Sequence, residues 1–153
     1  MKHDVTAAAV QFNISLGEID HNLATASEGL RRVAAQGAQL AVLPEMWSTG
    51  YDYRHLSDLA EQTPRVLITL QSLSLELKLV IVGSLPEKDG NALYNTLYVI
   101  DQGKQVGHYR KTHLFSSWEK IAFWQRDTPV WLFQPLPGQL WSGHSVPPCV
   151  FPN

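Results

Sequence analysis

The chain has 153 residues, enough for one domain with a hydrophobic core, and its 44% hydrophobic and 17% charged residues exclude a disordered segment. A net charge of −2 gives no basis for binding nucleic acid or an acidic membrane, and no apolar run is long enough to span a bilayer. The single cysteine, Cys149, excludes an internal disulfide framework. We therefore expect a cytoplasmic protein without nucleic-acid or membrane partners.

The first part of the sequence alternates predicted strands and helices. Residues 5–12 form a predicted strand of small apolar side chains, and Gly17 lies in the turn that follows. Asp20 is the predicted N-cap of a helix, and Gly37 ends that helix. The apolar run at 40–43 then predicts a second, buried strand.

One more helix and three more strands are predicted before residue 111. Thr63 and Pro64 are the expected N-cap and first helical position of the second long helix. The strands are predicted at 79–83, 93–100 and 105–110. The first of these is expected to be buried on both faces, and a glycine-containing hairpin turn joins the last two. Apolar side chains in these strands are expected to supply both faces of the sheet, namely Val80, Val82, Leu97 and Val99.

This order of elements predicts an α/β fold with a mixed sheet and flanking helices. Functional groups in such folds often follow the ends of strands. Glu45 comes just after the strand at 40–43, behind Pro44, which cannot donate to a strand ladder. A lone glutamate in a loop is more often a solvated surface residue. A second polar segment, Tyr-Arg-Lys-Thr-His-Leu-Phe at 109–115, places Lys111 at the end of another predicted strand.

Together these segments resemble the carbon–nitrogen hydrolase (nitrilase) superfamily over about residues 5–141. The matches are Leu-Pro-Glu at 43–45, Gly-Ser at 83–84 with Tyr-Asn-Thr at 94–96, and the segment 109–115. The resemblance implies the N-terminal half of an α-β-β-α sandwich, in which two sheets pack face to face with helices outside. It also implies an amidase-type enzyme without a cofactor, a homo-oligomer that hydrolyses a small linear amide to a carboxylic acid and ammonia.

The same resemblance assigns roles to three residues in a mechanism that passes through a cysteine thioester. Glu45 matches the general base, and Lys111 matches the lysine that stabilises the oxyanion. Glu119 matches a second glutamate that positions the base, and its alternative is a solvated loop carboxylate. Without this context, Lys111 beside Arg110 would be interpreted as protection of an edge strand. The short segment between Glu45 and Lys111 most resembles the branch that acts on ω-amides of dicarboxylic acids.

Two other kinds of site find no support in the sequence. His108 and His113 are not joined by a ligand-spaced cluster of cysteines or carboxylates, so no metal site is predicted. His113 is expected to be a structural, hydrogen-bonding residue. Ser116 and Ser117 lack the Gly-x-Ser-x-Gly frame that a serine hydrolase needs.

The nucleophilic cysteine of the family has no clear counterpart. A strand is predicted at 129–134, before the region where the nucleophile belongs. Cys149 lies at a compatible distance, 38 residues after Lys111, but three prolines surround it and cannot donate to a strand ladder. Cys149 is therefore predicted to be incidental rather than catalytic.

Residues 142–153 are expected to be an aberrant, out-of-frame tail behind a partial domain at 1–141. In shifted codons this tail is compatible with Cys-x-x-Leu-Arg-Phe-Pro-Glu, which is similar to the family's nucleophile motif, although the usual Tyr-Asp is not reproduced. Two hypotheses follow. The chain is either an amide hydrolase whose intact form carries the nucleophile, or a truncated fragment without activity. As written, the chain is expected to be inactive.

Overall fold

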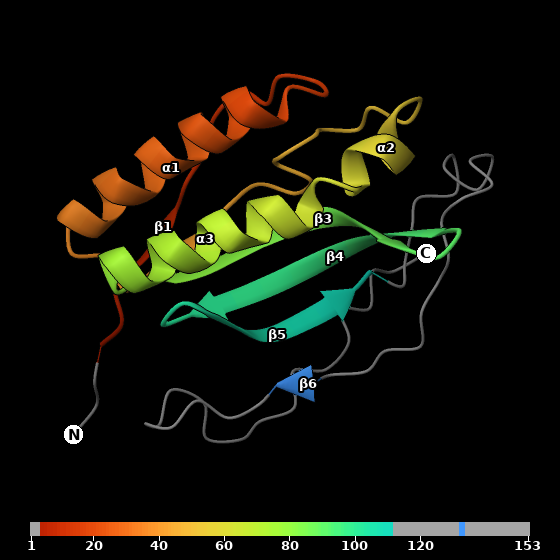
Figure 1. Cartoon of the computed structure of the whole chain (residues 1–153). Helices are drawn as coiled ribbons and strands as arrows, with labels where there is room; N and C mark the ends of the chain where they lie inside the picture. The colour runs from red at the N-terminus through yellow and green to blue at the C-terminus, as the bar shows by residue number, and fades with distance from the viewer. Residues whose placement is uncertain (1–3, 112–131, 134–153) are drawn as a thin grey trace, which may run out of the picture.

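The computed structural model describes residues 4–111 and 132–133 as helices packed against one mixed sheet (Figure 1). This confirms the expected α/β class with flanking helices. In this part of the chain no helix is both long and apolar enough to cross a membrane. The elements in chain order are β1 (Ala7–Ala9), α1 (Ile19–Ala35), β2 (Leu40–Val42), α2 (Leu56–Ala60), α3 (Thr63–Leu77), β3 (Val80–Asp89), β4 (Ala92–Asp101), β5 (Lys104–Arg110) and β6 (Leu132–Phe133).

The sheet is parallel on one side and antiparallel on the other. Its strand order is β1-β2-β3-β4-β5-β6; β1, β2 and β3 are parallel, and each later neighbour is antiparallel. Parallel neighbours need crossover connections, which α1 and then α2 with α3 supply. Because β5 follows two antiparallel steps after β3, it runs in the same direction as β2. The C-terminal ends of β2 and β5 therefore face the same edge of the sheet.

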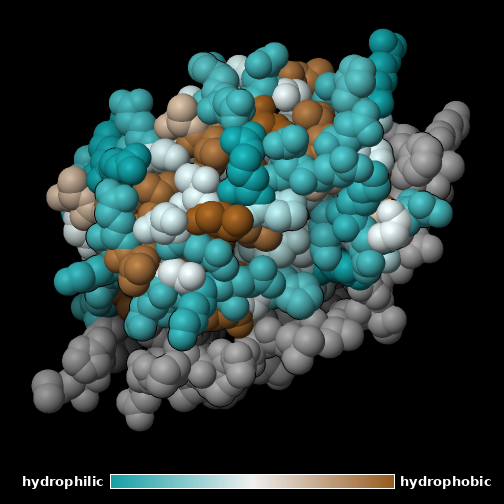
Figure 2. Space-filling model, in the orientation of Figure 1, coloured by the Kyte–Doolittle hydropathy of each residue, from teal (hydrophilic) through white to brown (hydrophobic). Residues whose placement is uncertain are grey.

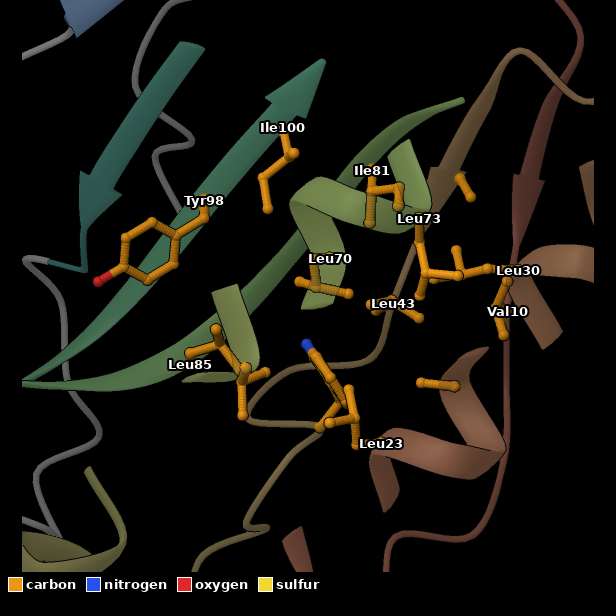
Figure 3. Close-up of a cluster of buried hydrophobic side chains, with 14 of the residues drawn as sticks. Val10, Leu23, Leu30, Leu43, Leu70, Leu73, Ile81, Leu85, Tyr98 and Ile100 are labelled. Carbon is orange, nitrogen blue, oxygen red and sulfur yellow. The ribbon is translucent and has the colours of Figure 1, made fainter. Parts of the chain in front are cut away.

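The hydrophobic core lies between the sheet and helices α1 and α3 (Figure 3). Gly29 of α1 allows a close approach to the sheet, because a Cβ atom there would lie 2.6 Å from a methyl group of Val10. The side chains labelled in the close-up come from both layers and are all buried: Val10, Leu23, Leu30, Leu43, Leu70, Leu73, Ile81, Leu85, Tyr98 and Ile100.

The opposite face of the sheet is more open. Val82 pairs with Val99 and Ser84 pairs with Leu97, whereas the fully buried Ile81 pairs with Ile100 on the helix side. Strand alternation thus puts four half-buried residues on the face away from the helices: Val80, Val82, Leu97 and Val99. The expectations that these residues supply both faces, and that the strand 79–83 is buried on both, are wrong. On the helix-bearing side, polar residues cover most of the surface (Figure 2).

Two predicted helix caps are also wrong, because tertiary contacts take the capping side chains. The N-cap of α1 is Glu18, and Asp20 lies in the first turn, where its carboxylate is 2.8 Å from the Arg65 guanidinium. Thr63 is already helical, and its hydroxyl donates a hydrogen bond to the carbonyl of Pro86. Helix α3 therefore begins one residue earlier than expected.

The strand predictions are right in number and type but not in length. The first two strands are shorter than predicted, β3 continues to Asp89, and the five-residue helix α2 was not predicted. The hairpin turn between β4 and β5 is confirmed, with positive φ at both Gln102 (48°) and Gly103 (78°). Strand β6 falls inside the predicted strand at 129–134 and pairs with β5.

Candidate active site

Glu45 is presented by a tight turn at the end of β2. The strand stops at Val42, and Pro44 brings no N–H group that would extend the ladder. Met46 then adopts a left-handed conformation, with φ at 52°, and its N–H donates a hydrogen bond of 2.9 Å to the hydroxyl of Ser84 on β3. A buried, non-glycine residue in this conformation is strained, so the surrounding contacts hold the turn in place.

Asn22 of α1 anchors the loop that follows. Its side-chain nitrogen donates to the carbonyls of Ser15 (2.7 Å) and Ser48 (2.9 Å), and its oxygen accepts the N–H of Ser15 (2.8 Å). The loop also packs closely on β3, because a Cβ atom at Gly83 would lie 3.0 Å from Nε1 of Trp47. Neither the anchoring role of Asn22 nor the close packing at Gly83 was predicted from the sequence.

Lys111 reaches the Glu45 carboxylate from the end of β5. Its Nζ atom lies 2.6 Å from Oε1 of Glu45, and the side-chain nitrogen of Asn95 donates to the same oxygen at 2.7 Å. The backbone N–H of Lys111 also donates to the carbonyl of Asn95 at 2.9 Å. The side chains of the two predicted residues thus converge. They do not lie on neighbouring strands, because β3 and β4 separate β2 from β5, and Asn95 of β4 bridges them.

Tyr51 adds a third donor to Glu45 from the loop before α2. Its hydroxyl is hydrogen-bonded to the Glu45 carboxylate, and its ring stacks on that of Tyr53 with centroids 5.8 Å apart. Burial and the negative charge of Glu45 raise the pKa of both tyrosines. Tyr51 therefore keeps its proton at neutral pH and remains a hydrogen-bond donor. This residue was also missed from the sequence, since no periodic pattern marks it.

The Glu45 carboxyl group is stabilised in its ionised form. Burial alone raises its pKa, but the hydrogen bond and charge of Lys111, with hydrogen bonds from Asn95 and Tyr51, outweigh burial and lower the pKa below its ordinary value. At neutral pH the group is therefore a carboxylate paired with an ammonium group. Such a pair can accept a proton at the carboxylate and present positive charge to an oxyanion.

The pair opens onto a pocket on the face of the sheet away from the helices. The pocket has a volume of about 330 Å³, the size of a site for a small molecule. Its lining combines apolar residues with polar side chains, and two of these, Asn95 and Lys111, contact Glu45. The lining residues are Val42, Leu43, Pro44, Glu45, Gly83, Ser84, Asn95, Leu97, Tyr109 and Lys111.

His108 is the one remaining predicted position that lies within the described residues. His108 is exposed on β5. Within residues 4–111 and 132–133, no three His, Cys, Asp or Glu side chains are grouped so that they could hold a metal ion. The other positions named from the sequence lie outside the described residues: Glu119, Cys149, His113, Ser116, Ser117 and the tail 142–153.

Known proteins are similar to this chain in both sequence and fold. A nitrilase from Pyrococcus abyssi is 36% identical over 124 residues, which cover 78% of this chain and 47% of the relative. A 2-oxoglutaramate amidase from Bacillus subtilis is 33% identical over 113 residues, covering 72% of this chain and 43% of the relative. The chain thus spans less than half the length of these relatives.

The fold likewise matches solved amidase structures. A crystal structure of an amidase from Nesterenkonia sp. aligns with a TM-score of 0.74 and 26% identity, covering 90% of this chain and 51% of that one. The family model described as carbon-nitrogen hydrolase matches residues 6–143, which include the Glu45 turn, Asn95 and Lys111. The chain belongs to the carbon–nitrogen hydrolase family.

Proposed function

We propose that Glu45 and Lys111 are the general base and the oxyanion-stabilising lysine of a site that hydrolyses a small linear amide to a carboxylic acid and ammonia. The observation that carries this proposal is the shared oxygen of Glu45, which accepts hydrogen bonds from both Lys111 and Asn95 at the mouth of a small pocket. Family membership supports the same chemistry, because the similar proteins include named amidases.

Each group has a defined task in this reaction. Glu45 accepts the proton of a cysteine thiol, and the thiolate attacks the amide carbonyl. The Lys111 ammonium group stabilises the negative oxygen of the tetrahedral intermediate. Glu45 then returns the proton to the departing ammonia, and water hydrolyses the thioester to the carboxylic acid.

The pocket supports a small amide as the ligand. Its apolar lining residues suit a short aliphatic chain, while the amide group would meet Glu45, Asn95 and Lys111. An amidase similar to this chain, from Nesterenkonia sp. AN1, has been solved in complex with acrylamide. We propose an ω-amide of a dicarboxylic acid as the substrate class, in line with the omega-amidases among the similar proteins.

The nucleophile separates this proposal from its alternative. Cys149 is the chain's single cysteine, it lies outside the described residues, and its proline-rich context predicts that it does not attack the carbonyl. The alternative is therefore a chain that carries the base and the lysine but has no turnover of its own. Glu119 is retained in the proposal as a second glutamate that positions Glu45.

Binding and turnover are tested separately on the full chain. Propionamide should perturb the NMR signal of the Asn95 side-chain amide, and Lys111→Met should weaken this binding, whereas the exposed Asn91 should not respond. The absence of any response at Asn95 at millimolar propionamide would remove the amide-site proposal. Ammonia release by the unmodified chain should be no faster than ammonia release by the Glu45→Gln variant. Turnover that Cys149→Ala abolishes would instead make Cys149 the nucleophile.

A further inference from the structure

A second cluster of charged residues lies behind the site, on the opposite face of β5. Arg110 is the last residue of this strand and directly precedes Lys111. Strand alternation points the two side chains to opposite faces of the sheet. The Arg110 guanidinium donates through Nη2 to Oε1 of Glu87 at 2.7 Å and through Nε to Oε2 at 3.0 Å. Both side chains are about four-fifths buried, with 20% and 23% of their surface exposed.

Contacts from two neighbouring strands, β3 and β4, hold this guanidinium in one orientation. Glu87 and Asp89 come from β3, and the Asp89 carboxylate lies 3.0 Å from Nη2 of Arg110. On β4 the ring of Tyr94 lies under the guanidinium, 3.9 Å from its centre, and the Thr96 hydroxyl donates to Glu87. Such a two-pronged pair restricts orientation as well as distance. An ordinary surface ion pair does not, since both of its side chains stay mobile.

Glu87 is ionised in this cluster. Burial raises the pKa of its carboxyl group, but the hydrogen bonds from Arg110 and Thr96 and the charge of Arg110 outweigh burial and lower the pKa. Both partners therefore carry full charge at neutral pH, and the pair persists under the conditions in which the site would work.

The pair is connected to the site through one peptide unit. Arg110 stands opposite Thr96 in the β4–β5 register, and the N–H of the next residue, Lys111, donates to the carbonyl of Asn95. With Arg110 fixed on one face and this N–H fixed at the strand edge, the Cα–Cβ direction of Lys111 is set. A lysine has four flexible side-chain bonds, so the position of its ammonium group depends on where its backbone starts.

From this arrangement we propose that Arg110 and Glu87 are positioning residues, which fix the end of β5 from the helix side and so hold the Lys111 ammonium group against Glu45. The importance of this positioning for catalysis rests on the function proposed above for Lys111. The positioning itself does not, because it concerns the distance between the Lys111 ammonium group and the Glu45 carboxylate in the described structure.

The pKa of Glu45 measures this positioning, and a double-mutant cycle isolates it. Arg110→Lys keeps the positive charge but removes the two-pronged contact. If Lys111 is positioned through Arg110, the variant raises the Glu45 pKa, followed by carbon-13 NMR of its carboxyl group, part of the way toward the value in Lys111→Met. In the Lys111→Met background, Arg110→Lys should change nothing further. Arg65→Lys, an exposed ion-paired arginine of α3, is the matched control and should leave this pKa unchanged.

The direction of the Glu45 pKa change in a second variant keeps the test decisive if Arg110→Lys does not fold. Glu87→Gln removes a negative charge, which by itself lowers the pKa of a neighbouring acid, whereas release of Lys111 raises the pKa of Glu45. A rise supports positioning. A folded Arg110→Lys with an unchanged Glu45 pKa, an equal rise in both backgrounds, or a fall in Glu87→Gln would overturn the proposal. Failure of propionamide to bind would count against the proposed function and leave this result standing.

Discussion

Lys111 and Glu45 are 66 residues apart in sequence, yet Nζ of the one lies 2.6 Å from Oε1 of the other. The topology brings them together, because β2 and β5 run in the same direction and end at the same edge of the sheet. Strands β3 and β4 lie between them, and the side-chain nitrogen of Asn95 on β4 donates to the same carboxylate oxygen. The pair is thus a property of the whole sheet, and each of its partners should control the proton affinity of Glu45.

Replacing Lys111 with Met should raise the pKa of Glu45. The substitution removes the hydrogen bond and the positive charge that lower this pKa, while the burial that raises it remains. The measurement is an NMR titration of the Glu45 carboxyl carbon. Lys88→Met, which removes an ammonium group paired with Glu61 at 2.6 Å, is the control and should have no effect on Glu45. An unchanged titration in Lys111→Met would contradict the observed pairing.

Removing the hydroxyl of Tyr51 should also raise the pKa of Glu45, by less than the loss of Lys111. Tyr51→Phe keeps the stacked ring but deletes a neutral hydrogen-bond donor to the carboxylate, whereas Lys111 supplies both a donor and a charge. Tyr53→Phe is the matched control, because Tyr53 stacks on Tyr51, whereas the hydrogen bonds that lower the pKa of Glu45 come from Lys111, Asn95 and Tyr51. Equal effects of the two substitutions would show that the ring environment, rather than the hydroxyl, sets this pKa.

The sequence predicts the sheet and the charged pair better than it predicts the loops between them. Periodic apolar runs mark the strands, and Glu45 and Lys111 follow strand ends, so both are visible in a linear pattern. Asn22 and Tyr51 act through non-local hydrogen bonds that leave no periodic trace. The predicted cap at Thr63 fails for the same reason, since its hydroxyl bonds a carbonyl on β3 instead of its own helix.

Asn22 should contribute strongly to stability through the Glu45 loop. It is fully buried and satisfies one N–H and two carbonyl groups of the chain. Asn22→Leu would leave these groups without their partner, at a cost of about 1–3 kcal/mol for a buried polar group, so we expect a loss of roughly 3 kcal/mol in the free energy of unfolding. Urea denaturation measures this loss. Thr25→Ala removes an exposed hydroxyl from the same helix and should change little.

The Arg110–Glu87 pair should make stability depend on pH in a defined window. The folded-state pKa of Glu87 is lowered, so its contribution is fully present above the pKa of the unfolded chain, about 4.3, and is lost as the pH falls through the folded-state value. At pH 6 the wild type should therefore exceed Glu87→Gln in stability by more than it does at pH 3.

Urea denaturation of both proteins at the two pH values measures this difference. Glu28→Gln, at an exposed position of α1, is the matched control for the loss of one carboxyl group. Its effect on stability should be small at both pH values, because substitutions at exposed surface positions usually change stability little. A difference between wild type and Glu87→Gln that stays the same at both pH values would mean that Glu87 is not held as a carboxylate by Arg110. The contacts that fix the end of β5 would then have to be steric, through the Tyr94 ring, rather than ionic.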